Sequence, residues 1–297
     1  MIEQIKPDFC IEIQFKKESE APSRIFKTLS ELIEAFIQLD KDLVQSIDPK
    51  LEPVIILEDI ESGSLKTWLR YAIKEIDDDA IKKLDWRPAV GKYILKAKYS
   101  ILNYLENKTE ITDIKDVKEI ENRLIELAEE TKTDIVSVLV TTQISPKRLF
   151  QNISNIFSAT THLLPEDSIS YITDYGRARF NLSFKIDPPL IEDLLTKEKI
   201  ESINEMILKV KKPDYLGESR WDFKHENKII SARITDYNWL KSFQERKIDV
   251  RPQDSIRARV RISTKYGYDF EVVGINYEIV EVLEIIPFTL VEQESLF

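Results

Sequence analysis

Glycine, cysteine and histidine are scarce in this chain of 297 residues, which contains six, one and two of them. Loops that bind phosphate groups usually need several closely spaced glycines, so the low glycine count argues against such a loop. A single cysteine, Cys10, excludes an intramolecular disulfide and any multi-cysteine metal site. Apolar residues alternate around Cys10, which predicts a buried thiol rather than a nucleophile. The sequence therefore indicates no metal and no cofactor.

Long apolar runs are missing as well. The longest, such as residues 53–57, are far shorter than the roughly 20 residues that span a bilayer. The first residues lack the basic start and the apolar stretch of a signal peptide. We therefore expect a cytoplasmic protein that does not enter a membrane.

Common catalytic motifs do not occur in the chain. The sequence contains none of four such patterns, namely the P-loop, Gly-x-Gly-x-x-Gly, His-Glu-x-x-His and Gly-x-Ser-x-Gly. Acidic residues at Glu58-Asp59, at residues 77–79 and at Asp222 leave open a metal-dependent nucleic-acid-processing enzyme, because paired carboxylates can hold Mg²⁺. Residues 77–79 can instead cap a helix. The sequence thus leaves the question of an enzyme open, and it favours a non-enzymatic role with no catalytic residue assigned.

Apolar periodicity predicts an α+β fold with two domains. Strand-like patterns predict strands at residues 9–15, 169–173 and 178–186, and a short apolar run predicts one at 53–57. Spacings of three and four predict helices at 22–39, 90–105, 114–130 and 146–162. Residues 1–200 are therefore expected to form a mixed α/β domain with a helical middle. Short strands at 221–223, 229–234, 256–262 and 277–286, with a helical turn at 236–243, predict a small OB/SH3-like β-barrel over residues 201–287. Residues 288–297 are expected to form a flexible tail.

Charge is unevenly distributed along the chain. The net charge is −10, most of it carried by residues 1–199, whereas residues 200–297 are close to neutral. An acidic surface repels phosphate backbones unless cations are concentrated locally. Nucleic-acid binding is therefore easier to place in the C-terminal domain.

One predicted strand of that domain carries a row of arginines. Arg257, Arg259 and Arg261 alternate with apolar residues, so an extended strand places three guanidinium groups on one face. Together with the aromatic ring of Tyr266, this face could bind a nucleic-acid backbone. In the alternative interpretation the arginines pair with acids on a neighbouring strand. The acids available are Glu278, Glu281 and Glu284.

The last five residues form a short peptide, Gln293-Glu294-Ser295-Leu296-Phe297. It resembles the pentapeptide with which many bacterial replication and repair proteins bind the DNA sliding clamp. Gln293, Ser295, Leu296 and Phe297 match that pattern, whereas Glu294 replaces the common leucine. The resemblance implies that Leu296 and Phe297 bury apolar surface in a pocket of the clamp, while Gln293 fixes the direction of the peptide. In the alternative interpretation, Leu296 and Phe297 fold back onto the protein.

A second resemblance involves residues 53–69 and residues 252–256. These segments resemble uncharacterised bacterial proteins associated with mobile elements and phage defence, which implies a bacterial origin and a defence setting.

Three hypotheses for the function remain from the sequence. The first is a non-enzymatic accessory or sensor protein of bacterial DNA metabolism or phage defence that docks on the sliding clamp. The second is a metal-dependent nucleic-acid-processing enzyme that uses the acidic clusters and the arginine row. The third is a protein-binding subunit of a multi-chain defence complex, in which other protein subunits are partners.

Overall fold

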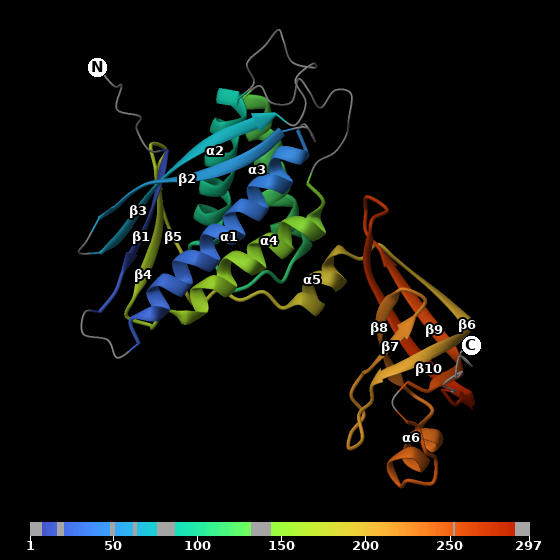
Figure 1. Ribbon diagram of the computed structural model, residues 1–297. Helices are drawn as coiled ribbons and strands as arrows, with labels where there is room; N and C mark the ends of the chain where they lie inside the picture. The colour runs from blue at the N-terminus through green and yellow to red at the C-terminus, as the bar shows by residue number, and fades with distance from the viewer. Residues whose placement is uncertain are drawn as a thin grey trace, which may run out of the picture. The chain divides into compact units, whose positions relative to one another are not determined.

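The computed structural model of the protein describes residues 8–16, 21–47, 51–61, 64–75, 87–131, 144–251 and 253–288. The chain divides into two compact units, Met1–Leu195 and Thr196–Phe297, shown in Figure 1. The boundary drawn near residue 200 would cut strand β6, which spans Glu198–Lys212 and belongs entirely to the second unit. The fold is α+β, with most of the described helices and an open sheet in the first unit, and a closed barrel with a short helix in the second.

The first unit contains a five-stranded antiparallel sheet with the strand order β2-β3-β1-β4-β5. Its strands are β1 (Phe9–Gln14), β2 (Leu51–Glu61), β3 (Leu65–Glu75), β4 (Ser168–Thr173) and β5 (Gly176–Arg179). β2 and β3 form a hairpin. The central strand β1 pairs on both sides, with Ile11 opposite Thr67 of β3 and Tyr171 of β4. The short buried strand β1 therefore joins the β2–β3 pair to the β4–β5 pair.

Helices cover one face of this sheet (Figure 1). The helices in contact with the sheet are α1 (Ser23–Gln45) and α2 (Arg87–Leu105). Behind them, α4 (Pro146–Ala159) packs on α1, α3 (Ile114–Thr131) packs on α2, and α5 (Pro188–Leu195) contacts α4. A 3₁₀ turn, Thr160–His162, follows α4. In the described ranges, no helix combines the length and the apolar character needed to cross a membrane.

Helix α1 shows why the chain folds this way locally. Its buried residues Ile25, Leu29, Leu32, Phe36 and Leu39 recur at spacings of three and four, which places them on one side of a helix. That side packs on the sheet, where the Phe36 ring meets the ring of Phe9 edge to face with 6.5 Å between centroids. The amphipathic pattern therefore fixes both the helix and the face it covers.

The strand predicted for residues 178–186 is wrong beyond its second residue. β5 ends at Arg179, and the chain then leaves the sheet. The rings of Phe180 and Phe184 pack instead against Phe157 of α4, at centroid distances of 5.9 and 4.4 Å. Burial of two aromatic rings against a helix outweighs the period-two pattern of this segment.

The second unit is a closed five-stranded barrel with the order β10-β8-β7-β6-β9. Besides β6, its strands are β7 (Trp221–His225), β8 (Lys228–Ile234), β9 (Ser255–Tyr266) and β10 (Val272–Ile286). Neighbouring strands are antiparallel except β8 and β10, which pair in parallel through Ala232–Ile234 and Tyr277–Ile279. The arrangement is compatible with an OB-like barrel.

An apolar core fills the barrel. Trp221 and Phe223 of β7 are fully buried and stack with 6.0 Å between their centroids. Helix α6 (Tyr237–Gln244) lies between β8 and β9 in the chain and contributes Leu240 and Phe243 to the same core. The Phe243 ring meets Trp221 at 4.8 Å, so α6 completes the packing around the largest core side chain.

Candidate functional site

The arginine row of β9 lies on the outside of the barrel. Ile256, Ala258 and Val260 are fully buried in the core, whereas the side chains of the alternating arginines are 40 to 57% exposed. The predicted separation of apolar and cationic faces is therefore confirmed. Tyr266 occupies an even-numbered position near the end of the strand, which belongs to the opposite face of a regular strand. The structure thus does not bring Tyr266 together with the arginines.

Each guanidinium group of the row is engaged by a carboxylate of an adjacent strand. Arg259 donates to Glu281 over 2.7 Å, and Arg261 donates to Glu278 over 3.1 Å. Arg257 contacts two acids, Glu284 at 3.0 Å and Glu205 of β6 at 3.2 Å. The alternative interpretation, in which the arginines pair with acids of a neighbouring strand, is confirmed.

Two β-bulges in β10 explain how these acids reach one face. Glu278, Glu281 and Glu284 are three residues apart, a spacing that would alternate between the faces of a regular strand. Register shifts between Ile279 and Glu281, and between Val282 and Glu284, each add one residue and return the next acid to the outer face. Four carboxylates thus balance three guanidinium groups, which leaves this face without the excess positive charge that a phosphate backbone requires.

The lysines of β6 and β7 are arranged differently. Lys209 and Lys224 lie directly opposite each other in the β6–β7 pairing, and neither forms an ion pair with a described carboxylate. This pair is not apparent from the sequence alone, because the pattern of residues 198–212 predicts no strand. The signal was present in the Lys-Val-Lys alternation of residues 209–211 and in Lys224.

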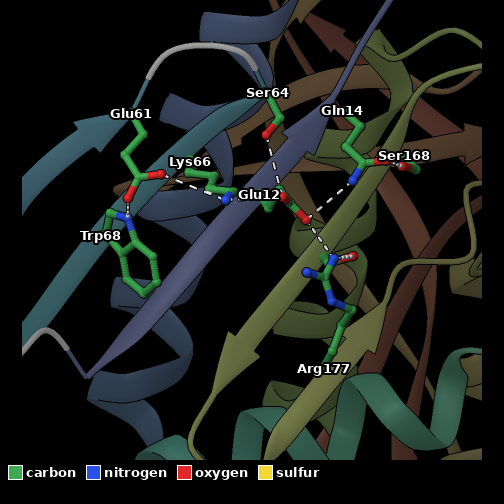
Figure 2. A network of polar contacts seen from close by, with 9 residues as sticks. Glu12, Gln14, Glu61, Ser64, Lys66, Trp68, Ser168 and Arg177 are labelled. Atoms are coloured by element: carbon green, nitrogen blue, oxygen red, sulfur yellow. Dashed lines mark hydrogen bonds and ion pairs between the residues drawn. The ribbon is translucent and has the colours of Figure 1, made fainter.

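A polar network occupies the face of the first unit's sheet that the helices leave open (Figure 2). Its centre is Glu12 of β1, which is only 5% exposed although it carries a carboxylate. Arg177 donates to Glu12 over 2.5 Å, Ser64 over 3.4 Å, and Lys66 lies at 3.9 Å. Two cations and a hydroxyl group therefore compensate the charge of the buried Glu12 carboxylate. Such a fully partnered carboxylate suits a structural role.

Lys66 also extends the network towards the β2–β3 hairpin. Its ammonium lies 3.7 Å from Glu61, which in turn accepts a hydrogen bond of 2.8 Å from the indole of Trp68 (Figure 2). Cys10 is fully buried on the same strand as Glu12. Burial, with Glu12 adding to it, raises the pKa of Cys10 to about 11, so the thiol stays protonated and unreactive at neutral pH. The prediction of a buried thiol is confirmed.

A fully buried ion pair lies between α1 and α2. Lys98 is 1% exposed, and its ammonium contacts both carboxylate oxygens of Asp40 at 2.7 and 2.8 Å. Tyr71 donates a hydrogen bond of 2.7 Å to the same carboxylate. Four aromatic rings surround the ammonium, at 4.5 to 5.9 Å from their centroids. They belong to Phe9, Phe36, Tyr71 and Tyr171.

The environment of this pair shifts the pKa of both members. Burial raises the pKa of Asp40 to about 6, against the opposing effect of Lys98. Burial likewise lowers the pKa of Lys98. Because neither side chain reaches solvent, the pair suits a structural rather than a catalytic role.

The acidic clusters do not form a metal site in the part of the chain that the structure describes. Within it, no three His, Cys, Asp or Glu side chains gather closely enough to hold a metal ion. Glu58 forms an ion pair with Arg70 over 2.7 Å, and the Asp59 carboxylate accepts a hydrogen bond from the backbone N–H of Ile60. Asp222 lies on β7, where its register partners are Lys212 and Ser231. Residues 77–79, predicted to cap a helix, lie outside the described residues.

The predicted docking peptide, Gln293, Ser295, Leu296 and Phe297 included, also lies outside the described residues. The last described residue is Phe288, two positions after β10 ends. Its backbone N–H donates to Asp254 over 2.9 Å, and the ammonium of Lys209 lies 4.8 Å from its ring centroid. These contacts tie the chain to the barrel at residue 288.

No protein-family model, curated protein or solved structure matches this chain.

Proposed function

We propose that the protein is a non-enzymatic accessory or sensor protein of bacterial DNA metabolism or phage defence, which docks on the DNA sliding clamp through residues 293–297. The observation that carries this proposal is the match of Gln293, Ser295, Leu296 and Phe297 to the clamp-binding pentapeptide. The protein acts in the cytoplasm, and its barrel is of the OB type, a five-stranded architecture that also serves binding functions.

The attachment of Phe288 supports this role for the tail. Gln293 follows Phe288 by five residues, so an extended chain carries it at most about 17 Å from the contacts of Phe288 with Asp254 and Lys209. A short connection of this kind keeps the barrel close to a bound clamp. The balanced charges of the arginine row add a second argument, because a barrel with no excess charge on that face gains from a partner that already encircles DNA.

Calorimetric titration of the full chain with the sliding clamp of the encoding bacterium tests the proposal. Leu296→Ala and Phe297→Ala should each weaken binding by about tenfold or more, since each removes roughly 1.5 kcal/mol or more of apolar burial. The matched variant Glu294→Leu restores the common residue of the motif and should tighten binding. Absence of binding by the intact chain, or equal affinity of the Leu296→Ala variant, would refute the proposal.

A further inference from the structure

The outer surface of β6 and β7 concentrates lysines on one face of the barrel. Lys209 pairs with Lys224, and Lys212 pairs with Asp222 across the same two strands. Partners in an antiparallel register point to the same side, and the intervening Val210 and Phe223 are buried in the core. Lys209, Lys212 and Lys224 therefore share the outer face, which we call the lysine face.

Like charges placed directly opposite each other on a sheet destabilise it. Lys209 and Lys224 lie directly opposite each other although the protein carries an acidic excess of ten charges. No described carboxylate forms an ion pair with either lysine. Asp222 lies on the same face, yet it forms no ion pair with its register partner Lys212. The contrast within one barrel is informative, since each arginine of β9 is matched with a glutamate.

Apolar side chains border the lysine face. Ile229 is the register partner of Lys224 on β8 and is 59% exposed. Phe288 is 45% exposed and packs beneath the ammonium of Lys209. Unpaired bases have apolar faces that can contact such side chains while lysines contact the phosphates, whereas a duplex stacks its bases inside. The pattern thus matches a single strand better than a duplex.

We propose that the lysine face binds the phosphate backbone of single-stranded nucleic acid, with Lys209 and Lys224 in direct contact with phosphates. Ile229 and Phe288 offer apolar surface to the bases at its border. This inference does not depend on the docking peptide, because it stands on residues of the barrel alone. It replaces the arginine row as the nucleic-acid surface of the second unit.

Fluorescence anisotropy of a labelled thymidine oligonucleotide of about 15 residues, titrated with the full chain, tests the proposal. The Lys209→Glu/Lys224→Glu variant should bind about tenfold or more weakly than the wild type. Its plot of log affinity against log salt should lose about 1.4 in slope, since each phosphate contact on a single strand contributes about 0.7. The variant exchanges one like-charged pair for another, so its thermal midpoint should stay close to that of the wild type, which shows that the barrel is folded.

The matched control is Lys241→Glu/Lys247→Glu, which makes the same change of charge on and just after α6, outside strands β6 and β7. It should bind like the wild type, as should a chain that lacks residues 293–297, which separates this test from that of clamp docking. Three outcomes would overturn the proposal. They are equal affinity of the Lys209→Glu/Lys224→Glu variant, an equal loss in the control, and tighter binding of the duplex form of the oligonucleotide.

Discussion

Replacement of Lys98 by methionine should destabilise the first unit by about 3 to 5 kcal/mol, the typical cost of removing one partner of a buried ion pair. The substitution keeps an unbranched apolar side chain in the space between the four rings, so packing is largely retained. What is lost is the cation that contacts both oxygens of Asp40 at 2.7 and 2.8 Å. The hydroxyl of Tyr71 still donates to the carboxylate, so we expect a value near the lower end of the range.

The loss should depend on pH in a defined direction. Burial already raises the pKa of Asp40 to about 6, above its value in the unfolded chain, and removal of Lys98 raises it further. The folded variant then holds a proton that the unfolded chain releases, so its stability falls as pH rises towards that higher pKa. The wild type does not lose stability from Asp40 above about pH 6. The difference between the two proteins should therefore be larger at pH 8 than at pH 5.

Thermal and urea unfolding followed by far-ultraviolet circular dichroism measures this effect, because, among the helices that the structure describes, α1 to α5 belong to the first unit and α6 to the second. A loss of about 3 kcal/mol lowers the midpoint of a unit of this size by roughly 6 to 12 °C. The control is Asp40→Leu/Lys98→Met, which removes both charges and should recover most of the lost stability. A single variant within about 1 kcal/mol of the wild type at pH 8, or a double variant as unstable as the single one, would refute the reasoning.

Three further predictions concern other features of the fold. Gly176→Ala should destabilise the β4–β5 hairpin by about 1 kcal/mol or more in chemical denaturation, because Gly176 has a φ of 141° and a Cβ would lie 2.7 Å from the hydroxyl of Tyr99. Asp167→Asn should lower the free energy of unfolding above about pH 4 and change it little below that pH. The reason is that, although burial opposes it, hydrogen bonds from Arg24 and from backbone N–H groups hold the pKa of Asp167 below its usual value. Urea titrations at pH 2 to 7 should show that the stabilities of the two proteins converge in acid. Arg259→Ala should change the unfolding free energy by less than about 1 kcal/mol in urea titrations, because its ion pair is exposed to solvent.

Elements with strong local patterns could be predicted from the sequence. Apolar residues recur at helical spacing in α1 and at every second position in β9, and both elements occur where these spacings predict them. β6 could not be predicted in this way, because its first eight residues are all exposed and its isoleucines at 200, 203 and 207 follow a helical spacing. Pairing with β9 from Glu198 to Lys209 makes it a strand, and that pairing depends on residues about 60 positions away.

The candidate sites show the same limit. The arginine row follows from alternation alone, yet its neutralisation depends on two bulges in β10 that the spacing of the glutamates does not reveal. The lysine face needs the register of β6 against β7, which brings together residues 15 positions apart in the chain. The buried Lys98–Asp40 pair joins two helices and is surrounded by rings from β1, β3, β4 and α1. Long-range packing, rather than local propensity, determines each of these arrangements.

The parallel pairing of β8 with β10 has a consequence for synthesis on the ribosome. The barrel closes only when residues 277–279 meet residues 232–234, so it cannot form until its last strand has left the ribosomal tunnel. The first unit has by then emerged completely and can fold alone. During the interval, the apolar inner sides of β6 to β8 are available to chaperones or to other nascent chains. A stalled chain that lacks β10 would therefore carry a finished first unit joined to an open, aggregation-prone sheet.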